Sequence, residues 1–489
     1  MGSKEVAMKI SVGSGKVFLL LFALILIYQM FIPPIVGLAD NGDFSRIMNK
    51  VGIQVGDGKE YMGNINLQFP ISFHYDTGGY QSSELIFVVT SIFLNSIVSK
   101  DGLFHLLSLG IVHLIALLAA IAVVAYGVSQ SKIRSKWVVL ACILIFFTDV
   151  GYVSYMNSIY SEPATLIFLT LTIGIVLLIA IQVNNQSVSI GWALFYFVTA
   201  FLFVIAKPQN AAMGIPLALL GYWLMRHVRP PKVIEKWRTQ IVLVLSIGLV
   251  VGSFLLFAFG LPNYYRSGDL WNSVFLEIIG TSQNPEQDLR ELGLPPEMII
   301  YKGKYAFAEG VNRNAYEEFQ HSWLYFRIFK FYLLHPGRLF SLMDSSTSQA
   351  FELQQSNLGN FVSSEAFGSY DKSQAFTFWN KLRMAVLPKS IWTLVGLFVI
   401  NLGTVWVRIK KFDHSKSSLL LSELHLTIIF MAVFQYLTVL MAEGTFELVK
   451  HMFLFNLLID ITFVFLIAYL VEALRLVFNR TRKNYQLIQ

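Results

Sequence analysis

The chain has 489 residues, of which 55% are hydrophobic and 14% are charged, and its mean hydropathy is +0.59. This composition excludes a soluble globular protein and predicts an all-α polytopic membrane protein. The formal net charge of +7 is spread over short basic clusters between apolar runs. It therefore predicts membrane topology and argues against a nucleic-acid interface.

Ten apolar runs approach or exceed the roughly 20 residues that cross a bilayer as a helix. Three of the four inner connections between them carry a basic cluster, such as Arg408, Lys410 and Lys411, while the fourth, 183–190, has no basic residue. Because basic residues are enriched on the cytoplasmic side, both termini are expected in the cytoplasm. The runs 191–206 and 211–225 are short, and a re-entrant hairpin is the alternative to two spans there. The expected bundle has about ten transmembrane helices, at residues 17–37, 104–128, 137–156, 163–182, 191–206, 211–225, 239–260, 389–407, 418–441 and 452–473.

Two connections on the outer side are long and divide the chain. In the first, residues 84–98 are apolar over about four helical turns, and Glu84, Ser91 and Asn95 fall near one face. This pattern predicts a helix that lies in the membrane interface. In the second, the aromatic stretch 315–343 predicts amphipathic helices that rest on the membrane. The expected organisation is an N-terminal transmembrane module (1–260) with a first outer loop (38–103), a large extracytoplasmic loop (261–388), and a C-terminal transmembrane module with a basic cytoplasmic tail (389–489).

Two carboxylates, Asp40 and Asp43, follow the first span together with Asn41 and Arg46. Ionisable side chains at the edge of a membrane are costly and rare, and they usually mark a functional site. A turn is the simpler explanation for residues 40–43, because Asn-Gly and Asp favour turns. Both interpretations stay open at this point.

Three further groups of polar residues lie at the ends of later spans, on the same predicted side of the membrane. Glu162 stands before a proline, and that pair also suits the first turn of a helix. Lys207 and Arg46 would also serve as cations that extend to the membrane surface. Lys450 and His451 run against the usual depletion of basic residues on the outer side, which favours a function. The complete set is Tyr160, Glu162, Lys207, Gln209, Asn210, Glu443, Lys450 and His451.

A carboxylate near separate cations suits transfer of a sugar from a lipid phosphate. The carboxylate removes the proton of an attacking hydroxyl, and the cations stabilise the charge that grows on the leaving phosphate. Paired carboxylates would also suit hydrolysis of a glycosidic bond. Hydrolysis accounts less well for Lys207, Lys450 and His451. The sequence contains no Cys/His spacing typical of a metal site.

Several short motifs follow one another along nearly the whole chain: 39–46 (ADNGDFSR), 157–163 (NSIYSEP), 207–210 (KPQN), 272–275 (NSVF) with 292–295 (LGLP), and 450–456 (KHMFLFN). In this order and on one predicted side of the membrane, they resemble the GT-C class of integral-membrane glycosyltransferases. More narrowly, they resemble bacterial hexose transferases of glycan biosynthesis.

The resemblance implies a lipid-facing groove for the donor and an outward-opening cavity for the acceptor. Asp40 or Asp43 is then the expected general base, and Glu162 assists it. These three carboxylates are also the expected ligands of a divalent cation, Mg²⁺ or Mn²⁺, which some relatives use. Lys207, Lys450 and His451 are expected to bind the donor phosphate. The other expected substrate-binding residues are Arg46, Asn41, Tyr160, Gln209, Asn210 and Glu443.

The expected partners are a polyprenyl-phosphate-linked hexose, a glycan or cell-envelope polymer as acceptor, membrane lipids and an enzyme that makes the donor. The resemblance favours a bacterial plasma membrane, with the active site on the extracytoplasmic side. One rival is a lipid-linked glycan polymerase or ligase, in which Arg266, Arg338 and His335 would matter. The other is a lipid-glycan transporter, which would place its polar groups at the bilayer midplane between repeated halves.

Overall fold

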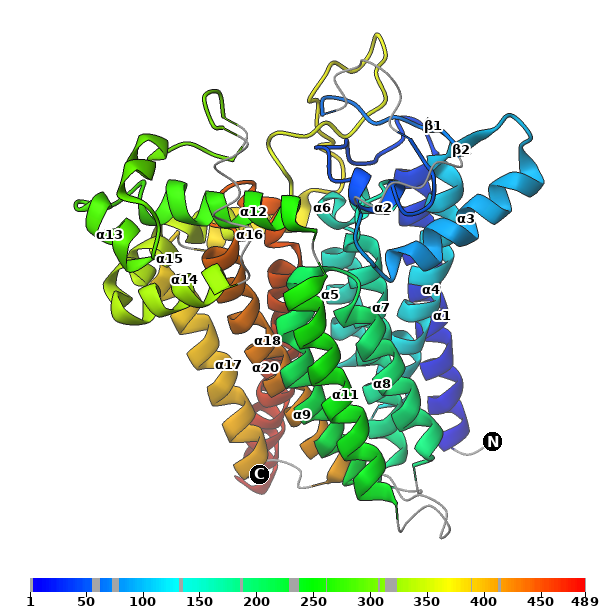
Figure 1. Ribbon diagram of the computed structural model, residues 1–489. Helices are drawn as coiled ribbons and strands as arrows, with labels where there is room; N and C mark the ends of the chain where they lie inside the picture. The colour runs from blue at the N-terminus through cyan, green and yellow to red at the C-terminus, as the bar shows by residue number, and fades with distance from the viewer. Residues whose placement is uncertain are drawn as a thin grey trace.

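Long helices run side by side through the molecule, and the two large predicted loops lie together at one end of them (Figure 1). The computed structural model describes residues 3–54, 62–72, 79–131, 135–184, 188–227, 237–260, 262–306, 308–312, 323–387, 389–411 and 415–488. Each of the ten predicted spans overlaps one helix of this bundle. These helices are α1 (Ser3–Phe31), α4 (Leu106–Gln130), α5 (Lys136–Phe147), α7 (Glu162–Gln182), α8 (Ile190–Val204), α9 (Gly214–Met225), α11 (Arg238–Phe259), α17 (Ile391–Lys411), α18 (Lys416–Ala442) and α20 (Phe453–Ile488).

Six of the described helices are long and apolar enough to cross a membrane, namely α4, α7, α11, α17, α18 and α20. A seventh span results if α5 is joined to the segment Val150–Asn157, to which it is bent by 58°. The described apolar part of α1, Gly15–Phe31, and α8 are shorter. Helix α9 has only 12 residues, about 18 Å, against a hydrocarbon core of about 30 Å. The chain is a polytopic all-α membrane protein, as predicted, but several of its predicted spans are shorter than a full crossing.

The outward faces of the bundle are apolar, which explains the hydrophobic excess of the sequence. Phe259 on α11 is 75% exposed, and Trp392 on α17 is 68% exposed. Side chains of this kind face lipid without cost, whereas in water they would form a large exposed apolar patch. Helix α7 is the most enclosed span and packs against α4, α8 and α18. Its first residue is Glu162, and the loop end of the bundle is where α7 begins (Figure 1).

The first outer loop folds back on the bundle. A short helix, α2 (Ser45–Met48), is followed by β1 (Gln68–Pro70), which pairs antiparallel with β2 (Leu103–His105). Between the strands lies α3 (Glu84–Val98), the predicted interfacial helix, which packs on α4. Its polar face is buried at Ser91 and Asn95, while its apolar side, including Val98 at 86%, is exposed. A helix with its apolar side outward at the loop end suits a membrane interface.

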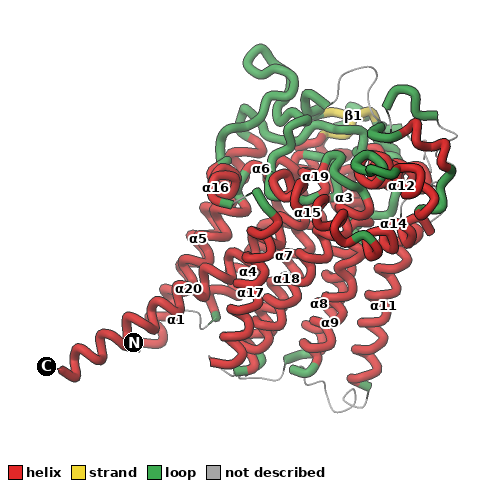
Figure 2. Tube along the Cα trace, turned by 90° about the vertical axis from the view of Figure 1, so that its left-hand side faces the viewer, coloured by secondary structure: helices red, strands yellow, loops and turns green. Residues whose placement is uncertain are grey.

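The second outer loop is mostly helical. It contains α12 (Asn263–Trp271), a π-helix (Asn272–Ile278), α13 (Pro285–Glu291), a 3₁₀ turn (Pro296–Tyr301), α14 (Trp323–Leu334), α15 (Pro336–Ala350) and α16 (Phe378–Val386). The amphipathic helices predicted at 315–343 are confirmed as α14 and α15; Tyr316 and His321 lie outside the described residues. Figure 2 shows these short helices and the loops gathered above the long helices. Both chain ends lie at the opposite end (Figure 1).

A buried ion pair fastens this second loop to the bundle. Arg383 on α16 donates to both carboxylate oxygens of Asp460 on α20, at 2.9 and 3.1 Å, and both side chains are fully buried. The same guanidinium donates to Asn456 at 2.5 Å, and Tyr152 donates to Asp460 at 2.6 Å. The two predicted transmembrane modules therefore share one core, with α16 fixed on top of it.

Candidate functional site

The segment after α1 forms a tight turn around the Asp40 carboxylate. Its Oδ1 accepts hydrogen bonds from the backbone N–H groups of Gly42, at 2.8 Å, and Phe44, at 3.0 Å. Gly42 has a φ of +99°, which disfavours residues with a side chain. The Ser45 hydroxyl closes the turn on the Gly42 carbonyl at 2.6 Å. The turn interpretation is thus confirmed, and the turn uses only Oδ1; the other carboxylate oxygen, Oδ2, accepts no hydrogen bond from the residues that the structure describes.

Lys450 connects this turn to the C-terminal motif. Its ammonium group forms an ion pair with Asp43 and donates to Asn41 Oδ1 at 3.0 Å, and its side chain is 1% exposed. It also lies 4.8 Å from the ring centre of Tyr160. The Tyr160 hydroxyl donates to the carbonyl of Ala39 at 2.8 Å and accepts from the Asn41 backbone at 3.0 Å. Three of the predicted motifs therefore meet at this one ammonium group.

A second cluster lies between α7, the 207–213 turn and the end of α18. Lys207 and Glu162 form an ion pair of 2.7 Å, with side chains 8% and 2% exposed. Gln209 bonds the Glu443 carboxylate and lies 2.7 Å from His451 Nδ1, and the same ring nitrogen contacts Glu443. The structure thus brings these five predicted residues together in two groups.

Asn210 is the predicted residue with a purely local role. Its amide donates to Thr165 Oγ1 and to the Phe203 carbonyl, both at 3.0 Å, and it is 1% exposed. These bonds tie the 3₁₀ turn Pro208–Met213 to α7 and α8. Asn210 therefore positions Lys207 and Gln209 and is a weaker candidate for a ligand contact.

The loop 443–451 holds its shape through two unusual backbone positions. Glu447 has a φ of +48° and Gly444 a φ of +72°. The carboxylate of Glu277, on the π-helix of the second loop, accepts from the Thr445 backbone at 2.9 Å and from its hydroxyl. Glu447 in turn accepts from Asn41 at 2.6 Å. Carboxylates from both sides thus position the loop that carries Lys450 and His451.

Helix α12 adds residues that the sequence did not single out. The Tyr265 hydroxyl lies 3.1 Å from Ser45 Oγ, and the Arg46 guanidinium lies 4.7 Å from the Tyr265 ring centre. Asp269 follows Tyr265 by one helical turn and so lies on the same face. Its charge interacts with Arg46, His451 and Glu443. In the sequence, the one indication of this site was the four-residue spacing of Tyr265 and Asp269, and many surface helices have such a spacing.

The carboxylates of the site differ in their affinity for protons. Burial raises the pKa of Asp40 from 3.8 to about 6, against the two backbone hydrogen bonds that lower it. Burial also disfavours the charge of Asp43, but Arg46, 2.9 Å away, and Lys450 hold its pKa well below the usual range. Burial and the neighbouring Glu443 raise the pKa of Asp269 to about 7. Asp43 is therefore a fixed anion, while Asp40 and Asp269 exchange protons near neutral pH.

The predicted cation site was Asp40, Asp43 and Glu162. Asp43 is paired with Lys450 and Arg46, and Glu162 is paired with Lys207. Within the described ranges, no three His, Cys, Asp or Glu side chains are grouped so that they could hold a metal ion. Asp43 and Glu162 thus have lysine and arginine side chains as their cationic partners.

The residues named for a polymerase or ligase are bound within the second loop. Arg338 pairs with Asp288 and donates to the Ile278 carbonyl. His335 lies 2.7 Å from Glu291, and Arg266 donates to the Ala258 carbonyl at 2.7 Å. The contacts of Arg338 and His335 join segments of the second loop, and that of Arg266 joins α12 to the end of α11.

The chain belongs to the family described as the YfdI N-terminal transmembrane domain, whose model matches residues 3–488. No curated protein matches the chain, and no solved structure matches it. The family description agrees with the polytopic helical fold, and the match covers every motif of the site.

Proposed function

We propose that this family member is an inverting glycosyltransferase that moves a hexose from a polyprenyl phosphate to a glycan or other cell-envelope acceptor. The observation that supports this best is the meeting of Asp40, Asp43, Arg46 and Lys450 at the loop end of a membrane bundle. A base and phosphate-binding cations are the two elements that such a displacement needs.

In this proposal Asp40 is the general base. A base works best when its pKa lies near the working pH, and burial brings that of Asp40 to about 6. Its Oδ1 is held by the turn, which leaves Oδ2 for the acceptor hydroxyl. Asp43 is a poor proton acceptor, because Lys450 and Arg46 stabilise its charge. Its role is to position these two cations.

The proposed reaction forms one bond, breaks one bond and moves one proton. The acceptor oxygen attacks the anomeric carbon, the bond from that carbon to the phosphate oxygen breaks, and the proton of the acceptor passes to Asp40. The leaving polyprenyl phosphate gains one negative charge. Lys450, Arg46 and Lys207 stabilise that charge in a site with little competing water.

The remaining polar groups of the site suit a sugar. Carboxylates accept hydrogen bonds from hydroxyl groups, and Asp269 faces the site from α12. We assign Asp269, Gln209 and Asn41 to the hexose hydroxyls. Glu162 fixes Lys207 and assists through it. A divalent cation enters the proposal only as a further positive charge bound to the donor phosphate.

The proposed location is the plasma membrane of a bacterium, with both termini cytoplasmic and the site outside. The basic clusters support this orientation through the positive-inside rule. The donor is a lipid-linked hexose made by a separate enzyme. The hexose and the acceptor are left to experiment.

The test is transfer by the purified protein from radiolabelled polyprenyl-phosphate hexoses to membrane-derived acceptors. The variants are Asp40→Asn and Asp43→Asn, and the control is Asp101→Asn in the same outer loop, where Asp101 bonds His105 at 2.7 Å. We expect transfer by the wild type and the control, and its loss with Asp40→Asn. Full transfer by the Asp40→Asn variant would refute the assignment of Asp40 as the general base. Absence of transfer from every donor by the wild type would refute the function.

A further inference from the structure

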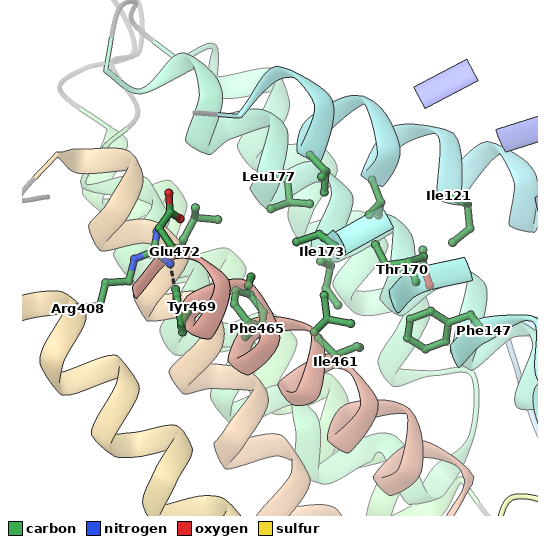
Figure 3. A pocket seen from close by; sticks show the side chains of 17 residues that line it. Ile121, Phe147, Thr170, Ile173, Leu177, Arg408, Ile461, Phe465, Tyr469 and Glu472 are labelled. Atoms are coloured by element: carbon green, nitrogen blue, oxygen red, sulfur yellow. Dashed lines mark hydrogen bonds between the residues drawn. The ribbon is translucent and has the colours of Figure 1, made fainter. Parts of the chain in front are cut away.

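A groove of about 110 Å³ lies in the half of the bundle far from the site. Figure 3 shows its two walls: Ile173 and Leu177 of α7 face Ile461 and Phe465 of α20 across it. These four side chains are half-buried, so the groove is open to one side. Residues of α4 and α5, such as Ile121, line it further.

The groove has the length of one membrane leaflet. Along α20 its lining runs from Ile461 to Glu472, a rise of roughly 16 Å at 1.5 Å per residue. Half of a hydrocarbon core of about 30 Å is roughly 15 Å. Ile461 lies two turns below the start of α20 at Phe453, and Glu472 lies toward the chain ends. The groove therefore extends from near the membrane centre to the surface opposite the site.

Only the surface end of the groove is charged. Arg408 at the end of α17, Tyr469 and Glu472 gather there (Figure 3). The Arg408 guanidinium donates to Tyr469 and to Ser418 Oγ, the latter at 3.1 Å, and lies 4.8 Å from the Tyr469 ring centre. A guanidinium has five N–H donors, and its planar fork suits phosphate. These bonds orient Arg408 and leave donors for a ligand.

We propose that this groove binds one acyl chain of a zwitterionic phospholipid with a primary ammonium group, such as phosphatidylethanolamine. The chain lies between α7 and α20, the lipid phosphate binds Arg408, and the ammonium group faces Glu472. One cation and one carboxylate at the same end match a headgroup that carries both charges. A polyprenyl phosphate fits less well, because its phosphate has to reach the site at the other end of the bundle. The exclusion of a polyprenyl phosphate rests on the proposed function, whereas the apolar walls, the length and the charged end of the groove do not.

The experiment uses the full chain, purified and reconstituted in vesicles of phosphatidylethanolamine and phosphatidylglycerol. A trace of phosphatidylethanolamine with a diazirine at the end of one acyl chain is crosslinked by light, and labelled peptides are identified by mass spectrometry. We expect label on residues 170–177 and 461–468 above that on the lipid-exposed helix α11. Ile173→Trp fills the groove and should reduce this label to the level of α11. Val251→Trp, a matched tryptophan at a half-exposed position of α11, should not change it.

Two charge variants test the headgroup. Arg408→Gln removes a charge-assisted bond to phosphate and should weaken competition by unlabelled phosphatidylethanolamine roughly tenfold. Glu472→Gln should abolish the preference for phosphatidylethanolamine over phosphatidylglycerol. All variants are first compared with the wild type by elution volume and thermal unfolding. Equal label on α11 and the groove, no effect of Ile173→Trp, or stronger competition by a polyprenyl phosphate would each overturn the proposal.

Discussion

Replacement of Asp40 by asparagine should stabilise the protein while it removes the activity. The amide oxygen of asparagine can still accept the bonds from Gly42 and Phe44, so the turn is kept. The charge that is lost is one that the fold disfavours, since burial raises the pKa of Asp40 from 3.8 to about 6. That difference corresponds to a cost of roughly 3 kcal/mol for the ionised form.

The sign follows from the two pKa values. Between pH 4 and pH 6 the unfolded chain has released the proton of Asp40, whereas the folded chain still holds it. The stability of the wild type therefore falls as the pH rises through this window, and the full cost is present above pH 6. The gain from Asp40→Asn should be close to zero at pH 4 and should approach about 3 kcal/mol at pH 8.

Thermal unfolding in detergent, followed by tryptophan fluorescence at pH 5 and pH 8, measures this difference. Asp101→Asn provides a control of opposite sign. Hydrogen bonds from the Leu103 backbone and from His105 lower the pKa of Asp101 to about 2. Replacement of this favoured carboxylate by an amide should therefore destabilise the protein at pH 8. If the Asp40→Asn variant has a lower unfolding temperature than the wild type at pH 8, the ionised carboxylate of Asp40 does not destabilise the folded protein. The argument for Asp40 as base would then fail.

Transfer activity gives a second readout of the same carboxylate. In the wild type, kcat/KM should fall as the pH drops through about 6, because the base becomes protonated. The negative charge of Asp43 contributes to the raised pKa of Asp40. Asp43→Asn should therefore move this acid limb to lower pH, whatever its effect on the maximal rate. Loss of a general base should reduce transfer by about 10²- to 10⁴-fold at pH 7.5 in Asp40→Asn.

Four other substitutions test other parts of the structure. Lys450→Met removes one of the two cationic partners of Asp43 and leaves Arg46, so it should destabilise the protein by less than the roughly 3–5 kcal/mol of a fully broken buried pair; adding Asp43→Asn should restore part of the stability in thermal unfolding but not transfer. Arg383→Met should destabilise by about 3–5 kcal/mol, while the folded fraction at low temperature keeps its KM for the donor. Gly444→Ala places a Cβ 2.8 Å from Glu277 at a φ of +72° and should reduce transfer without changing the elution volume. Asp269→Asn should raise the KM for the hexose donor more than it lowers kcat, and an unchanged KM would remove Asp269 from the sugar site.

The topology was predictable because it depends on one-dimensional features. Apolar runs give the helices, and the positions of polar motifs such as 39–46 and 450–456 give the end of the bundle at which they meet. The lengths of the individual spans were less predictable. Helix α9 begins only at Gly214 because the residues before it form the 3₁₀ turn Pro208–Met213. That turn is supported by packing on α11 and α18 and by the hydrogen bonds of Asn210, none of which the sequence indicates.

The partners within the site could not be predicted. Lys450 and Lys207 were both expected to bind phosphate, but the sequence did not indicate that the first would pair with Asp43 and the second with Glu162. Asp269 was missed because its importance comes from the docking of α12 on Ser45 and Arg46. Such contacts between distant segments depend on tertiary packing, which leaves no regular pattern in a single sequence.

The pairing of the site cations has a consequence for the order of events. Arg46 and Lys450 are both engaged by Asp43, and Lys207 by Glu162, so a donor phosphate has to share or displace a carboxylate when it binds. Lys450 lowers the pKa of Asp40, and a phosphate that neutralises Lys450 would weaken this effect. The pKa of Asp40 should then rise toward the working pH after the donor has bound, which makes it a stronger base at that moment. A donor-dependent shift of the acid limb of single-turnover transfer would follow from this order, and a limb that is the same in kcat and in kcat/KM would contradict it.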